Sequence, residues 1–121
     1  MIRVVVADDE QDVRTLLRLQ LESNGFAVVG EAADGAEAVT LCTELTPDAA
    51  VIDLLMPGTT GFEAIPALRR VIPELAIVAY TAVAGDFVRA EMARLHIPLL
   101  LKSGDPTSLT AKIRELVNNG S

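Results

Sequence analysis

The sequence is poor in the residues that build disulfides, zinc sites and catalytic triads, because its 121 residues include one cysteine and one histidine. A single cysteine, Cys42, excludes an internal disulfide bond and is typical of a protein in a reducing cytosol. Cys42 lies in the apolar segment AVTLC, so we interpret it as a buried core residue. His96 has no obvious triad partner, and no Cys/His spacing typical of a metal site occurs.

Long hydrophobic runs are also absent, although 50% of the residues are hydrophobic. The apolar stretches are short segments such as VVVA, LAIVA and PLLL, well below the about 20 residues that a membrane-spanning helix needs. The beginning of the sequence lacks the basic-then-apolar layout of a secretory signal, because acidic residues arrive by Asp8. We therefore expect a cytoplasmic protein that makes no contact with membranes.

Positive charge is scarce, with 10 Lys and Arg against 17 Asp and Glu and a formal net charge of −7. No run of basic residues is present to neutralise nucleic-acid phosphates, so we expect no direct nucleic-acid binding by this chain. A glycine-rich phosphate loop of the P-loop type is missing too. These absences leave acidic side chains as the main source of chemistry.

Predicted strands and helices alternate along the whole chain. Short, nearly continuous apolar segments predict strands over residues 2–7, 26–32, 48–53, 75–80 and 98–101. Helices are predicted over residues 10–24, 34–43, 61–71, 85–95 and 106–117. Such strands are typical of a parallel sheet covered by helices on both faces, and right-handed crossovers make it an open, doubly wound sheet.

Two of the predicted helices carry a feature that the structure can test. In the first helix, one buried side is expected to contain most of the apolar residues Val13, Leu16, Leu17, Leu19 and Leu21. In the third helix, Pro66 removes a backbone hydrogen bond, so we expect this helix to be kinked or to start late.

Four predicted strands are each followed by polar side chains: Asp8, Asp9 and Glu10 after the first, Asp53 after the third, Thr81 after the fourth and Lys102 after the fifth. In doubly wound sheets, ligands bind beyond the carboxyl ends of the strands, near the point where strand order reverses. Each side chain alone has an ordinary interpretation as a cap, a turn residue or a surface charge. Their convergence on one edge of the sheet indicates a functional site.

The residue types in this set fit phosphoryl chemistry. Adjacent carboxylates repel one another, and a hard divalent cation such as Mg²⁺ relieves that repulsion with the oxygen ligands it prefers. An Asp carboxylate is itself a nucleophile that forms an aspartyl phosphate. In-line phosphoryl transfer needs positioning and charge neutralisation, which Mg²⁺, Lys102 and Thr81 would supply.

Four motifs in order along the chain, DDE at 8–10, VIDLLMPGTTG at 51–61, AYTA at 79–82 and LLLKS at 99–103, resemble the receiver domain of two-component response regulators. The segment FAVVGEAADGAEAV makes the sequence most similar to the NarL/LuxR type. Those transcription regulators usually carry a C-terminal helix-turn-helix output domain, and none is present in this sequence. The resemblance implies a flavodoxin-like (CheY-like) (βα)5 fold with strand order 2-1-3-4-5. One receiver domain is expected over residues 1–118, with residues 119–121 as a tail or a cloning remnant.

The resemblance implies a role for each acidic residue. Asp53 would be the phosphoacceptor, taking a phosphoryl group from a sensor histidine kinase. Asp9 and Asp53 would bind Mg²⁺ directly, together with the backbone carbonyl of Leu55, while Asp8 would bind it through a water. Glu10 is expected to be an acid at the start of a helix.

The resemblance also implies how the signal leaves the site. Thr81 would hydrogen-bond the phosphoryl group, Lys102 would pair with it, and the loop after Thr81 would follow. This movement would switch the face of the fourth helix, fifth strand and fifth helix, which commonly serves dimerisation or partner contact. A homodimer is therefore one expected assembly. Such a domain is not an enzyme, because it catalyses only its own phosphorylation and dephosphorylation.

The sequence departs from the family pattern at positions that affect switching and phosphate lifetime. Leu99 stands where family members usually have an aromatic residue, so the usual aromatic switch is not expected in its standard form. Leu55 and Val83 stand where side chains tune hydrolysis of the aspartyl phosphate. Both are apolar and neither orients an attacking water, so we expect slow self-dephosphorylation.

Two alternatives from other functional classes remain at this point. A haloacid-dehalogenase-like phosphatase also uses Asp, Thr or Ser, Lys and Mg²⁺, but its nucleophile follows the first strand in a D-x-D pattern. A phosphorylation-independent, receiver-like interaction module is the second alternative, and Leu99 is the residue that favours it. Turnover of a phosphate ester would identify the first alternative, and a complete lack of phosphorylation the second.

Overall fold

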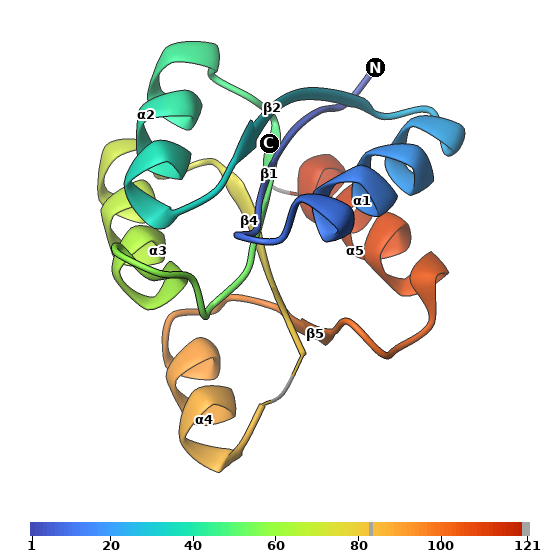
Figure 1. Cartoon of the computed structure of the whole chain (residues 1–121). Helices are drawn as coiled ribbons and strands as arrows, with labels where there is room; N and C mark the ends of the chain where they lie inside the picture. The colour runs from blue at the N-terminus through green and yellow to red at the C-terminus, as the bar shows by residue number, and fades with distance from the viewer. Residues whose placement is uncertain (83, 120–121) are drawn as a thin grey trace.

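A computed structural model of the chain describes residues 1–82 and 84–119. In this part of the chain, strands and helices alternate in the predicted order (Figure 1). The strands are β1 Arg3–Ala7, β2 Ala27–Ala32, β3 Ala49–Ile52, β4 Ala76–Thr81 and β5 Leu99–Leu101. The helices are α1 Gln11–Ser23, α2 Gly35–Leu45, α3 Gly61–Val71, α4 Asp86–Arg94 and α5 Pro106–Asn119.

The strands form one parallel sheet in the order β2-β1-β3-β4-β5, so the predicted doubly wound fold is confirmed. From β1 the chain crosses to β2 on one side and then returns to β3 on the other side of β1. The strand order therefore reverses between β1 and β3. Ligand sites in such sheets lie beside this reversal, at the carboxyl ends of the strands.

The sheet separates two hydrophobic cores, one on each face. Figure 1 shows α1 and α5 on one side of the sheet and α2 and α3 on the other. The first core contains buried residues of α1 and α5, including Leu17, Leu21, Leu109 and Ile113. The second contains buried residues of α2, α3 and α4, including Ala38, Cys42, Ile65, Leu68 and Met92. Burial raises the pKa of the Cys42 thiol to about 11, as expected for a core cysteine.

Helix α1 buries fewer leucines than its sequence predicts. Leu17 and Leu21 are buried, but Leu16 and Leu19 are 66% and 61% exposed, so the expectation of one buried side was wrong for these two. At 3.6 residues per turn, positions four apart fall on one stripe. Leu16 and Leu19 fall beside that stripe and form a second, exposed apolar strip.

Helix α3 begins at Gly61, before Pro66, so the alternative of a late start was wrong. A capping box at Thr60 explains this early start. The Thr60 hydroxyl accepts a hydrogen bond from the Glu63 amide, and the Glu63 carboxylate accepts one from the Thr60 amide. Pro66 therefore lies inside a helix whose first turn is already fixed.

Helix α5 continues through Asn119, two residues beyond its predicted end at Val117. Within the described residues, no helix is long and apolar enough to cross a membrane. Val83, one of the two positions expected to affect phosphate hydrolysis, lies outside the described residues, as do positions 120 and 121 of the predicted tail.

Candidate functional site

Backbone hydrogen bonds continue past the strand ends and hold the first acidic residues in register. The Asp8 amide donates to the Ala32 carbonyl, and the Asp53 amide donates to the Ala7 carbonyl, each at 2.9 Å. The two carboxylates thus follow neighbouring strands β1 and β3, at the reversal of strand order. Their positions relative to each other are set by the sheet.

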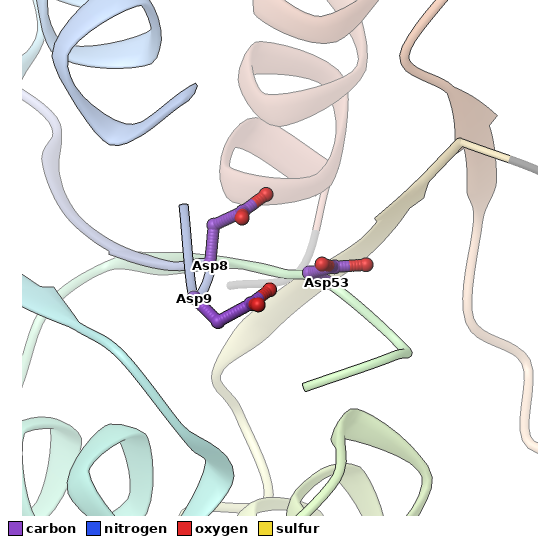
Figure 2. A group of neighbouring side chains, drawn as sticks. All are labelled: Asp8, Asp9 and Asp53. Atoms are coloured by element: carbon purple, nitrogen blue, oxygen red, sulfur yellow. The ribbon is translucent and has the colours of Figure 1, made fainter. Parts of the chain in front are cut away.

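Three carboxylates meet at this edge. Oxygen atoms of Asp8, Asp9 and Asp53 lie within 4.8 Å of one another (Figure 2). Asp8 is 1% exposed and Asp53 is 5% exposed, whereas Asp9 faces solvent. Burying two like charges this close requires a positive charge near them.

Lys102 supplies part of that positive charge. Its Nζ donates to Oδ2 of Asp8 at 2.5 Å and to Oδ2 of Asp53 at 3.3 Å. Its position is fixed through the backbone, because the Lys102 amide donates to the Thr81 carbonyl at 2.8 Å. One lysine thereby joins the residues that follow β1, β3 and β5.

The pKa values reflect this partial compensation. Burial raises the pKa of the Asp53 carboxyl, although the Leu55 amide and Lys102 act in the opposite direction. For Lys102, burial disfavours the charge. The hydrogen bond to Asp8 and the charges of Asp53 and Asp8 outweigh it, so the pKa of Lys102 is raised. Desolvation therefore disfavours the ionised form of Asp53, while the charged form of Lys102 is favoured.

We predict that Asp53→Asn stabilises the chain at neutral pH in buffer without divalent cations. A raised carboxyl pKa carries no penalty below the pKa of the unfolded chain, where both states are protonated. The penalty grows as pH rises through the folded-state pKa, and neutral Asn removes it. We expect about 1 kcal/mol of added stability at pH 7, measured by urea unfolding, and a difference that vanishes in acid. Equal or lower stability of Asp53→Asn at pH 7 would contradict the desolvation of Asp53.

The loop after Asp53 is held against this residue by a close backbone approach. The Leu55 amide donates to Oδ1 of Asp53 at 3.3 Å, and the Gly61 amide donates to the Leu54 carbonyl at 3.2 Å. A Cβ atom on Gly61 would overlap the Asp53 carbonyl oxygen and lie 2.8 Å from Cα of Leu54. Next to Asp53, the backbone therefore leaves no space for a side chain at position 61.

The remaining predicted site residues also lie at this edge. Thr81 is the last residue of β4 and is 1% exposed. Leu55, in the loop after Asp53, is 62% exposed. Glu10 precedes α1 as its N-cap residue without a side-chain cap, and its amide donates to Oδ1 of Asp8 at 2.9 Å. The structure therefore gives Glu10 a backbone role at the start of the helix.

Sequence reasoning missed one charged residue beside the site. Arg14 on α1 donates from Nη1 to the backbone carbonyl of Asp8 at 2.6 Å and pairs through Nε with Glu31 at 3.3 Å. Its place one turn into an amphipathic helix is typical of a solvated charge. The sequence signal that could have indicated this role is the position of Arg14, shortly after the acidic pair Asp8 and Asp9.

The donor set fits a hard divalent cation. All three clustered groups offer carboxylate oxygens, the ligands that Mg²⁺ prefers. The cluster has three carboxylates and one neighbouring ammonium group, which contacts Asp8 and Asp53, so an excess of two negative charges remains. A divalent cation would neutralise that excess.

Comparison with known proteins agrees with this geometry. The model of the response regulator receiver domain family matches residues 4–114 of the chain. The transcriptional regulatory protein LiaR of Bacillus subtilis (strain 168) is 40% identical over 116 residues, which cover 94% of this chain and 55% of LiaR. The chain spans about half the length of the curated relatives it matches.

Two solved structures extend the comparison to the fold. A two-component response regulator of the LuxR family from Aurantimonas sp. SI85-9A1 has a TM-score of 0.91 and 33% identity, covering 98% of this chain and 86% of that one. The isolated REC domain of RcsB from Salmonella enterica serovar Typhimurium, solved in the presence of phosphomimetic BeF3−, has a TM-score of 0.89 and 28% identity. It covers 98% of this chain and 89% of that one.

The chain belongs to the response regulator receiver domain family. It is a signalling domain of two-component systems, similar to the receiver domains of LuxR-family regulators.

Proposed function

We propose that Asp53 accepts a phosphoryl group from the phosphohistidine of a sensor histidine kinase. The observation that carries the proposal is the cluster of three carboxylates, Asp8, Asp9 and Asp53, of which Asp8 and Asp53 are buried and in contact with Lys102. An isolated buried carboxylate would be protonated or avoided. A carboxylate kept next to an ammonium group at the end of a central strand is suited to nucleophilic attack on phosphorus.

In the proposed reaction, a carboxylate oxygen of Asp53 attacks the phosphorus atom in line with the phosphorus–nitrogen bond of the phosphohistidine. That bond breaks as the new phosphorus–oxygen bond forms, and its electron pair stays on the imidazole. Lys102, whose Nζ already contacts Oδ2 of Asp53, neutralises charge on the transferred group. Thr81 binds an oxygen of the phosphoryl group through its hydroxyl.

Asp9, Asp53 and the backbone carbonyl of Leu55 are the groups that would hold Mg²⁺ directly, with Asp8 acting through a water. When bound, Mg²⁺ neutralises charge on the phosphoryl oxygens. The chain's own residues do the positioning, since the sheet holds Asp8 and Asp53 and the loop held by Gly61 brings Leu55 beside them.

A groove beside the site supports docking of a helical kinase domain. It encloses about 750 Å³ and is lined by the exposed leucines of α1 together with residues near the site, including Leu16, Leu19, Tyr80, Lys102 and Pro106. Lys102 belongs both to the groove and to the acidic cluster. A helix lying in this groove would present a histidine close to Asp53.

Switching is proposed to act through the charge that phosphorylation adds. A phosphoryl group brings about −1.5 to −2 charge and strong acceptor oxygens. Thr81 would be drawn toward it, and the face of α4, β5 and α5 would change, which alters contacts with a partner or a second copy. Leu99 lies in β5 and packs against the core shared with α4, so any switch there uses an aliphatic side chain.

The output is proposed to lie in a longer protein. LiaR is a transcriptional regulatory protein, and this chain covers 55% of it. A C-terminal helix-turn-helix domain attached to this receiver would bind DNA. The receiver itself is acidic, so DNA binding is assigned to the attached domain.

The test is the intact mass of the chain after incubation with acetyl phosphate, with and without Mg²⁺. We expect a Mg²⁺-dependent gain of one phosphoryl group in the wild type and none in Asp53→Asn. Asp48→Asn is the matched control, because Asp48 precedes β3, at its other end, and its carboxylate accepts from the Arg3 amide. No gain in the wild type under any condition would favour the interaction-module alternative.

A further inference from the structure

The peptide bond that joins Asp8 to Asp9 is held by a side chain from outside the acidic cluster. Nη1 of Arg14 donates to the Asp8 carbonyl at 2.6 Å, while the Asp8 amide is fixed to β2. Among the described residues, no hydrogen bond reaches the Asp9 carboxylate. The direction of the Asp9 side chain therefore depends on its backbone. Arg14 helps to hold that backbone, together with the bond of the Glu10 amide to Asp8.

Arg14 is itself anchored on a second element. Its Nε pairs with Oε1 of Glu31 at 3.3 Å, and the two side chains are 16% and 29% exposed. Glu31 lies near the end of β2, and its other oxygen accepts from Arg18 at 2.8 Å. The guanidinium of Arg14 thus bridges the end of β2 and the loop after β1.

A bulge in β2 makes this bridge possible. The pairing of β1 with β2 shifts between Val4, opposite Val28, and Val5, opposite Gly30. Val28 packs on the α1 side, whereas Val29 packs on the α2 side and a Cβ on Gly30 would also point to α2. Because Val29 and Gly30 both face α2, the next residue, Glu31, faces the α1 side. In a regular strand, alternation would place Glu31 on the α2 side, away from Arg14.

We infer that Arg14 is a positioning residue for cation binding, which holds the Asp8–Asp9 peptide so that Asp9 points into the acidic cluster. The inference rests on the proposed function, because it assigns Arg14 a part in the same Mg²⁺ site. Residues that orient ligands through hydrogen bonds typically change metal affinity by about 10- to 100-fold when they are replaced.

Charge and positioning make opposite predictions for Arg14. If only its charge mattered, removing a cation near three carboxylates would strengthen Mg²⁺ binding. If it positions Asp9, removing it weakens Mg²⁺ binding in spite of the lost repulsion. The sign of the change distinguishes the two.

The experiment is Mg²⁺ titration by calorimetry of Arg14→Gln, Arg14→Lys and Arg18→Gln. Arg18 is the matched control, because it lies on the same helix and pairs with the same Glu31 but donates to the Val28 carbonyl instead of the Asp8 carbonyl. We expect Arg14→Gln to bind Mg²⁺ about tenfold more weakly, Arg14→Lys to be intermediate, and Arg18→Gln to stay within about twofold of the wild type. Saturating Mg²⁺ should restore most of the phosphorylation rate of Arg14→Gln.

Unchanged or tighter Mg²⁺ binding by Arg14→Gln would overturn the inference, as would an equal loss in Arg18→Gln. If Arg14→Gln fails to fold, Glu31→Gln removes the anchor of Arg14 instead, and unchanged Mg²⁺ affinity in that variant would overturn it. A wild-type chain that neither binds Mg²⁺ nor takes up a phosphoryl group would refute the proposed function itself. A wild type that does both, with Arg14→Gln matching it, refutes only the role of Arg14.

Discussion

Lys102→Met is expected to lower the free energy of unfolding by about 3 kcal/mol at pH 7 without divalent cations, and to abolish phosphorylation. Methionine keeps much of the volume of the lysine stem but not its charge. Asp8 and Asp53 would then remain buried at 1% and 5% exposure without the ammonium group that contacts both. The stability loss arises from two uncompensated carboxylates.

The effect of Mg²⁺ on Lys102→Met separates the loss of stability from the loss of phosphorylation. Because Lys102 repels a cation bound by the same carboxylates, Lys102→Met should bind Mg²⁺ more tightly than the wild type and recover much of its stability with it. Phosphorylation should stay absent at saturating Mg²⁺, since the charge on the transferred group is no longer neutralised by Lys102.

Urea unfolding with and without Mg²⁺ measures the stability effect, and intact mass measures phosphorylation. Lys112→Met is the control, because Lys112 pairs with the exposed Glu115 on α5 and should change stability by less than about 1 kcal/mol. A Lys102→Met protein as stable as the wild type without Mg²⁺ would show that the acidic cluster does not need this lysine.

Gly61→Ala is the second change with a large expected effect. The added Cβ would overlap the Asp53 carbonyl oxygen and approach Cα of Leu54, and both are backbone atoms that no rotamer change can move. We expect a loss of about 3 kcal/mol in stability, the upper range for overpacking. The displacement of Asp53 should also slow phosphorylation about 100-fold, even where the protein is fully folded.

Gly85→Ala is the matched control for Gly61→Ala. A Cβ on Gly85 meets nothing within 4 Å, and its φ of −87° suits any residue. The control should lose no more than about 1 kcal/mol and keep the wild-type phosphorylation rate. If Gly61→Ala matched this control in both measurements, the close approach of the loop to Asp53 would have no functional importance.

The fold follows from features that are local in the sequence. Each strand is a short apolar run and each helix is a periodic segment, so their order alone indicates a parallel, doubly wound sheet. The set of site residues follows for the same reason: polar side chains such as Asp53 and Lys102 come directly after buried strands, and parallel strands bring their carboxyl ends to one edge.

The remaining features depend on distances between segments far apart in sequence. Nothing local marks Leu16 as exposed, because its exposure depends on how α1 lies on the sheet. The bridge from Arg14 to Glu31 needs a bulge in β2, and FAVVGEA reads as an uninterrupted strand. The spatial requirement at Gly61 appears only when the loop has folded back onto Asp53.

The most direct test of the central claim identifies the phosphorylated residue itself. Treating the phosphorylated chain with borohydride reduces an aspartyl phosphate to homoserine, which peptide sequencing by mass spectrometry then places in the chain. The account predicts homoserine at position 53 and unchanged aspartate at positions 8 and 9. Homoserine at Asp8 or Asp9, or a phosphoryl group on a residue that borohydride leaves intact, would contradict it.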